Sequence, residues 1–116
     1  MAAGSPTLAV ANEEHLDFQD MFGGKDRYVL KVTGNSMIEN HIADGDYVVI
    51  RKQENAENGE QVVAMIDNEV TLKKYYHEKG HIRLEPANGE MNPIIVEPTQ
   101  SAQILGVLVG VLRKCI

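Results

Sequence analysis

The chain has 116 residues, of which 43% are hydrophobic and 24% charged, values typical of one soluble globular domain. Its formal net charge of −6 argues against direct binding to nucleic acid, because DNA-binding domains usually present a basic face to the phosphates. The single cysteine, Cys115, excludes an internal disulfide bond, and the four histidines lack the spacing of metal ligands. We therefore expect no metal and no cofactor. No apolar run approaches the roughly 20 residues of a membrane helix, so we expect a cytoplasmic protein without membrane attachment.

The first two dozen residues differ from the rest of the chain. Residues 1–10 are small and apolar, residues 12–20 are polar and acidic, and Gly23-Gly24 is a flexible joint. We predict an N-terminal arm over residues 1–24 and a β-domain over residues 25–116. In the β-domain, runs rich in Val, Ile and Tyr alternate with turn residues and predict strands over residues 28–32, 47–51, 61–66, 69–76, 81–85, 94–97 and 102–112. The expected fold class is mainly β, with twisted antiparallel sheets and little helix.

The clearest hairpin of the chain puts Lys73 on a paired strand. The dipeptide Asp67-Asn68 separates two of the predicted strands, and both side chains tolerate the positive φ of a tight turn. Side chains alternate along a strand, so Lys73 shares one face with Thr71 and Tyr75, opposite Val70 and Leu72. If Val70 and Leu72 face the core, Lys73 points into a cleft, where loss of water lowers its pKa. The alternative is a solvated strand lysine, the common case for this residue type.

Ser36 also has two interpretations. Ser36-Met37-Ile38-Glu39 matches the S-x-x-E capping box, in which the serine side chain begins a short helical turn and the glutamate reaches back to it. A serine between a strand and a helical turn also lies beside backbone N–H groups that can hold an oxyanion. A serine needs a nearby base to act as a nucleophile, and a lysine is that base only when it is neutral. The chain therefore offers Ser36 and Lys73 either as a helix cap and a surface residue or as a catalytic pair.

A series of short motifs runs through the whole β-domain. The motifs are Gly34-Asn35-Ser36-Met37, Ala43-Asp44-Gly45-Asp46-Tyr47-Val48-Val49, Asn58-Gly59-Glu60-Gln61-Val62-Val63-Ala64 and Glu69-Val70-Thr71-Leu72-Lys73-Lys74, followed by Leu84-Glu85-Pro86-Ala87-Asn88, Pro93-Ile94-Ile95-Val96 and the apolar residues 104–111. In order and spacing they resemble the self-cleaving C-terminal domains of LexA-type SOS repressors, a serine-lysine protease family. The resemblance implies the β-fold of that family, with Ser36 as the nucleophile and Lys73 as the general base.

The arm carries a second part of this resemblance. Ala2-Ala3-Gly4-Ser5-Pro6 is similar to the family's self-cleavage site, which implies a scissile bond between Ala3 and Gly4. Small side chains there let an extended backbone approach Ser36 closely. Ser36 would attack the Ala3 carbonyl after Lys73 removes its proton, and the backbone N–H groups of Asn35 and Ser36 would stabilise the oxyanion.

The resemblance also implies partners. In the family, a RecA filament on single-stranded DNA promotes cleavage, which separates the DNA-binding domain from the dimerising domain and releases transcription of DNA-repair genes. We expect a homodimer, in which the apolar strand over residues 104–111 either pairs with a partner strand or lies in its own core. Operator DNA is expected to be bound only through a helix-turn-helix domain, which is missing from this chain.

Three alternatives remain open. UmuD-like mutagenesis proteins share the catalytic domain, but their cleavage sites are typically Cys-Gly. Signal peptidases share the chemistry but require membrane attachment. A nonenzymatic dimerisation module would need neither Ser36 nor Lys73.

Overall fold

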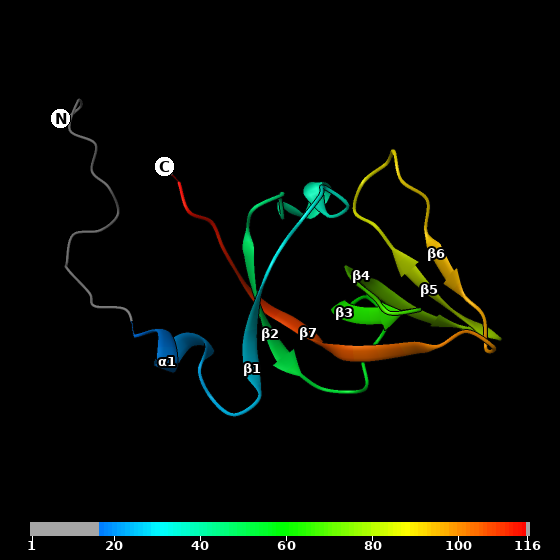
Figure 1. Ribbon diagram of the computed structural model, residues 1–116, viewed down its shortest axis with the longest axis horizontal. Helices are drawn as coiled ribbons and strands as arrows, with labels where there is room; N and C mark the ends of the chain where they lie inside the picture. Colours follow the sequence, from blue (N-terminus) through cyan, green and yellow to red (C-terminus); the bar gives the residue numbers. More distant parts are fainter. Residues whose placement is uncertain (1–16, 116) are drawn as a thin grey trace.

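The computed structural model describes residues 17–115, which form one curved antiparallel sheet preceded by a short helix. The strands lie side by side in the order β1-β2-β7-β3-β4-β5-β6 (Figure 1). The elements are α1 (Phe18–Phe22), β1 (Arg27–Lys31), a 3-10 turn η2 (Ile38–Asn40), β2 (Tyr47–Lys52), β3 (Gln61–Ile66), β4 (Glu69–Glu78), β5 (His81–Glu85), β6 (Ile94–Val96) and β7 (Ala102–Leu112). The expected mainly β fold is confirmed, and each predicted strand is present with ends within two residues. The described strands form a single sheet rather than several.

The β3–β4 hairpin has the turn that its sequence predicts. Asp67 and Asn68 have φ values of 49° and 70°, the left-handed conformation required at both central positions of a tight hairpin turn. The turn sets the register in which Val62 lies opposite Lys73 and Val63 opposite Leu72. This register fixes the position of Lys73 along the sheet.

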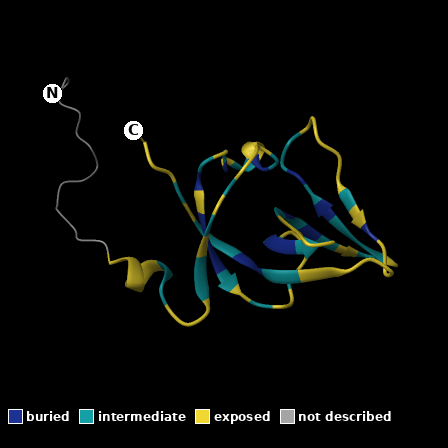
Figure 2. Cartoon of the chain, in the orientation of Figure 1, coloured by how far each residue is buried: buried dark blue, intermediate teal, exposed yellow. Residues whose placement is uncertain are grey.

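The sheet is packed on both of its faces. Val62 and Val63 are neighbours in β3, yet they belong to separate hydrophobic clusters because successive side chains point to opposite faces. Figure 2 shows the buried residues gathered along the middle strands, with exposed residues at the strand ends and turns. The pairing of β7 with its two neighbours shifts register at Val49/Ile50 in β2 and at Val63/Ala64 in β3. Such bulges bend a sheet, and here they let it curl.

The predicted arm contains a helix that the sequence analysis did not foresee. Asp17 is the N-cap of α1, and its side chain accepts a hydrogen bond from the backbone N–H of Gln19. Phe22 packs against β7 at Gly110, where an added Cβ would lie 2.5 Å from Cε1 of the Phe22 ring. Gly24 follows with a φ of 123°, a conformation that favours glycine. The end of the arm is therefore attached to the sheet, and the chain turns sharply at Gly24. None of the helices in the described part of the chain is long and apolar enough to cross a membrane.

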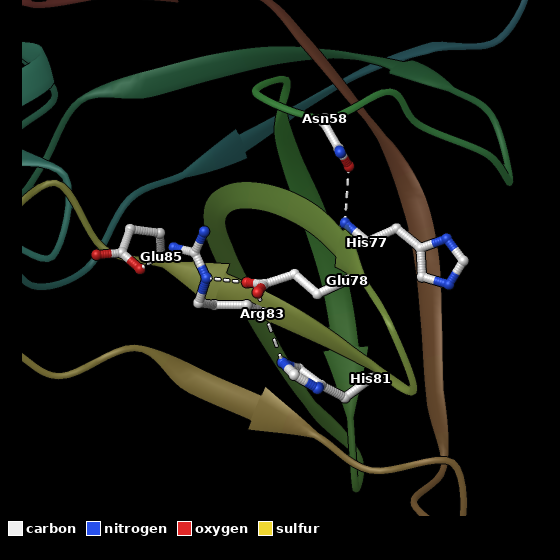
Figure 3. A network of polar contacts seen from close by, with 6 residues as sticks. All are labelled: Asn58, His77, Glu78, His81, Arg83 and Glu85. Atoms are coloured by element: carbon white, nitrogen blue, oxygen red, sulfur yellow. Dashed lines mark hydrogen bonds and ion pairs between the residues drawn. The ribbon is translucent and has the colours of Figure 1, made fainter.

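A polar network stiffens the end of the β4–β5 hairpin (Figure 3). Arg83 bonds to Glu78 and also to Glu85, with Nη1 2.6 Å from Oε2 of Glu85. Its guanidinium lies 4.4 Å from the centre of the Tyr76 ring. Because water screens these exposed ion pairs, each contributes little to stability. The Arg83–Glu78 pair joins β5 to the end of β4, the strand that contains Lys73.

Candidate active site

Ser36 lies in the connection between β1 and the 3-10 turn η2. Its side chain does not cap that turn: Met37 is the N-cap residue, and no side-chain capping bond is formed. The capping-box interpretation is therefore wrong. Glu39, which would have reached back to Ser36, instead accepts a hydrogen bond from the backbone N–H of Gly89, with a distance of 2.7 Å. The hydroxyl of Ser36 is left available for another partner.

The loop that carries Ser36 is closed at its base by backbone pairing. The N–H of Val32 donates to the carbonyl of Asp46, and the N–H of Gly45 donates to the carbonyl of Val32, both at 2.8 Å. Within the loop, the Asp44 carboxylate accepts from the N–H of Gly34, and the Asn35 side chain accepts from the N–H of Asp44. These bonds hold the backbone immediately before Ser36 in one conformation.

The same loop is held by an ion pair between a buried carboxylate and a half-exposed arginine, which no sequence motif indicates. Asp46 is 2% exposed, and both of its carboxylate oxygens accept from the guanidinium of Arg113, at 2.8 and 2.9 Å. Arg113 also donates to the carbonyl of His41. Hydrogen bonds from Arg113 hold the pKa of Asp46 at about 2, below its usual value. The chain just after β7 is thereby tied to the loop that carries Ser36.

Lys73 is buried, with only 6% of its surface exposed. The structure therefore excludes the solvated strand lysine. Its Nζ donates to the Oγ of Ser36 at 3.0 Å and to the Oγ1 of Thr71 at 2.5 Å. Burial lowers the pKa of the Lys73 amine below its ordinary value, because the charged form loses its hydration. No carboxylate among residues 17–115 forms a salt bridge with Lys73. Burial therefore shifts this amine toward the uncharged form that a base requires.

Thr71 was not selected as a site residue from the sequence. The signal was present, since strand alternation places Thr71 and Lys73 on one face two residues apart. The opposite face of β4, which carries Val70 and Leu72, is only partly buried. Leu72 packs against the core, but Val70 is 56% exposed and lies beside the cleft. The premise that both Val70 and Leu72 face the core is therefore wrong for Val70, and the burial of Lys73 is established by its own low exposure instead.

A cleft of about 280 Å³ contains both Ser36 and Lys73. One wall is the end of β1 with the loop that follows it, and the opposite wall is the first half of β4. These two strands are separated by three others in the sheet order, and the curl of the sheet brings them together. The lining is largely apolar; it includes Leu30, Val32, Val48, Val63, Leu72 and Met91. An apolar lining excludes water from the Ser36–Lys73 contact and explains the burial of the amine.

Backbone donors are available beside Ser36. Among residues 17–115, no acceptor forms a hydrogen bond with the N–H group of Asn35 or of Ser36. Unpaired N–H groups in a cleft are suited to an oxyanion.

Ala3 and Gly4, the expected cleavage site, lie outside the described residues, as does His15. Of the other histidines, His41 and His77 are exposed and His81 is partly exposed. No group of three metal-ligating side chains is found in the described part of the chain.

Comparisons with known proteins identify the family of this chain. The family model Peptidase S24-like matches residues 1–109. The chain is 47% identical over 117 aligned positions to the LexA repressor of Clostridium novyi (strain NT), covering 98% of this chain and 57% of that protein. It is 45% identical over 115 positions to the LexA repressor of Koribacter versatilis (strain Ellin345), covering 98% of this chain and 54% of that protein. The chain thus spans just over half the length of these relatives. Both findings confirm the expected resemblance, and the chain belongs to the Peptidase S24-like family.

Proposed function

We propose that this chain is the self-cleaving C-terminal domain of an SOS-response repressor. It acts as a serine protease on its own Ala3–Gly4 bond, with Ser36 as nucleophile and Lys73 as general base. The observation that carries the proposal is the 3.0 Å contact between the buried Lys73 Nζ and the Ser36 Oγ. A lysine amine is rarely buried without an acidic partner, and here its depressed pKa matches the requirement of a base.

The reaction is acyl transfer within one chain. The neutral amine of Lys73 takes the hydroxyl proton of Ser36 while Oγ forms a bond to the carbonyl carbon of Ala3. The N–H groups of Asn35 and Ser36 bind the oxygen that becomes negatively charged. The tetrahedral intermediate then breaks the Ala3–Gly4 bond, and Lys73 returns the proton to the nitrogen of Gly4. A water molecule, deprotonated by Lys73, releases the Ala3 acyl group and restores Ser36.

The two walls of the cleft suit an extended peptide. β1 pairs with β2 on one side, and no strand of the described chain pairs with its other side. Residues 69–73 of β4 pair with β3, whereas β5 pairs with β4 only from Lys74 onward. Each wall therefore presents a strand edge with unpaired backbone groups, the surface to which an extended segment adds by hydrogen bonding. The modest size of the cleft favours small side chains, as in Ala3 and Gly4.

The relatives named LexA repressor support a repressor role, and the other proposed partners follow from the resemblance to self-cleaving SOS repressors. A RecA filament on single-stranded DNA stimulates cleavage, and cleavage inactivates the repressor and derepresses DNA-repair genes. Operator DNA is bound through another part of the repressor. The chain forms a homodimer through β7. Residues 108–112 pair with β2 but not with β3, so within residues 17–115 one edge of this apolar segment has no strand beside it. Val111 on this segment is 39% exposed.

The test is the intact mass of the purified chain after incubation from neutral to strongly alkaline pH. We expect a product that begins at Gly4 and forms faster as pH rises, because more Lys73 becomes neutral. Ser36→Ala and Lys73→Ala are the matched controls and should show no product. A separate peptide covering residues 1–12 should be cut by the same chain, and a RecA filament should accelerate self-cleavage. An unchanged chain and an uncut peptide at every pH would instead favour a nonenzymatic dimerisation module.

A further inference from the structure

The loop after β5 contacts the nucleophile loop at two points that bracket Ser36. Nδ2 of Asn88 donates to the carbonyl of Asn35 at 2.9 Å. On the other side of Ser36, the N–H of Glu39 donates to the carbonyl of Ala87, and the Glu39 carboxylate accepts from the N–H of Gly89, both at 2.7 Å. Residues 87–89, here called the brace, therefore hold the chain on both sides of the nucleophile.

The hydrogen bond from Asn88 also orients the N–H group of Ser36, because the two residues Asn35 and Ser36 share one peptide group. The carbonyl of Asn35 and the N–H of Ser36 belong to the same planar unit, and this unit is trans. In a trans peptide the C=O and N–H bonds point in opposite directions. A donor that fixes the Asn35 carbonyl therefore fixes the direction of the Ser36 N–H.

The brace also belongs to the same structural unit as the cleft. Met91, three residues after Asn88, lines the cleft that contains Ser36 and Lys73. Asn88 is partly buried, and its own Oδ1 accepts from the N–H of Glu90, which holds the amide so that Nδ2 faces Asn35. Neither Ser36 nor Lys73 has Asn88 as a hydrogen-bond partner in the described chain. Asn88 thus forms no hydrogen bond with the proton-transfer pair in the described part of the chain.

We propose that Asn88 is a positioning residue that aims the Ser36 N–H at the oxyanion. This inference rests on the proposed protease function and adds a residue to it. Asn88 acts through the Asn35–Ser36 peptide and touches neither the substrate nor Lys73. Its loss lowers the rate of the chemical step, because an oxyanion donor works only when it is already aimed before the charge develops.

The experiment compares the whole chain with Asn88→Asp and Asn88→Ala, using the peptide of residues 1–12 as substrate. Asn88→Asp keeps the shape and the acceptor for the N–H of Glu90 but removes the side-chain donor to the Asn35 carbonyl, which then keeps only the longer bond, 3.3 Å, from the backbone N–H of Ile38. Asn88→Ala removes the donor without adding charge. Glu90→Ala is the matched control, since only the backbone of Glu90 takes part in the brace.

We expect both Asn88 variants to lower kcat by about 10- to 100-fold, a part of the roughly 100- to 1,000-fold that loss of a whole oxyanion donor costs. In Asn88→Ala, KM and the pH midpoint of the rate should stay as in the parent chain, because no charge is added near Lys73. Asn88→Asp adds a carboxylate on the loop that lines the cleft, so it is compared by kcat alone. The Ser36 amide resonance in a ¹H–¹⁵N spectrum should move in both variants and remain in place in Glu90→Ala. An unchanged kcat in both variants, or a loss that appears only in KM, would overturn the inference.

The amide measurement separates this inference from the proposed function. If the parent chain cuts nothing while the Ser36 amide still responds to Asn88→Ala, the protease assignment fails and the coupling of Asn88 to the Ser36 peptide stands. If the parent chain cuts the peptide and neither kcat nor the amide responds, the protease assignment stands and the role of Asn88 is refuted.

Discussion

Replacing Thr71 by valine should move the pH dependence of cleavage downward by about one unit. The Thr71 hydroxyl accepts a hydrogen bond from Nζ of Lys73 at 2.5 Å. A hydroxyl that accepts from an ammonium group stabilises the charged form, so Thr71 opposes the lowering of the Lys73 pKa by burial. Valine has nearly the same shape and offers no acceptor, so the pKa of Lys73 should fall further in the variant.

The magnitude follows from the difference between charged and neutral hydrogen bonds. A hydrogen bond to a charged group contributes about 1.5–3 kcal/mol and one between neutral groups about 0.5–1.5 kcal/mol. Thr71 can bond to both forms of the amine, so only the difference, on the order of 1–1.5 kcal/mol, enters the pKa. At about 1.4 kcal/mol per unit this is close to one pKa unit.

The assay is the rate of formation of the product that begins at Gly4, followed from neutral to strongly alkaline pH. Thr71→Val should reach half of its maximal rate about one unit lower than the parent chain and should cleave faster at neutral pH. Thr71→Ser retains the hydroxyl and should keep the parent midpoint. A Thr71→Val midpoint equal to or above that of the parent would refute the reasoning, because it would mean that the hydroxyl does not favour the protonated amine.

Three further predictions concern stability. Lys73→Met should raise the melting temperature at neutral pH, and this gain should shrink as pH rises toward 10.5. Burial lowers the pKa of Lys73 in the folded state, so between the folded pKa and 10.5 the unfolded chain binds more protons and the parent gains stability as pH rises. An equal gain at all pH values would contradict a buried titrating amine. Asp46→Asn should lower the free energy of unfolding in urea at neutral pH, because it breaks the ion pair with Arg113. The difference from the parent should vanish as pH falls from 3.8 toward about 2, where the parent carboxylate is itself protonated. A difference that persists below that range would argue against the ion pair. Gly106→Ala should cost about 1–3 kcal/mol of unfolding free energy, since the added Cβ would lie 2.6 Å from the backbone oxygen of Arg51 and collide with Ile50. A urea midpoint equal to that of the parent would show that the strands can move apart.

The strands could be predicted because their signals are local. The alternation of apolar and polar residues and the Asp67-Asn68 turn each act over a few positions, and both appear in the structure as expected. The short helix α1 was missed, because five residues with two exposed apolar side chains, Phe18 and Met21, carry little periodic signal. Its position depends on the packing of Phe22 against Gly110, which no local pattern reveals.

The site residues, too, could be predicted only in part from the sequence. Ser36 and Lys73 could be named from motifs, but the sequence left the capping box and the solvated lysine open as alternatives. Only the 3.0 Å contact between the two side chains, made across 37 positions of the chain, distinguishes these interpretations. The supporting contacts were not foreseen at all: Asn88 reaches Asn35 across 53 positions, and Arg113 reaches Asp46 across 67.

The sequence by itself determined which residues form strands, where the main hairpin turns and which side chains share a face with Lys73. These features depend on backbone geometry that repeats every one or two residues. The tertiary structure decided that Lys73 loses its water, that Ser36 bonds to Lys73 rather than to the backbone of a helical turn, and that Asn88 faces the peptide of Ser36. Those outcomes depend on how far the sheet curls, and the curl follows from strand order and from register shifts against β7 that join residues distant in the chain.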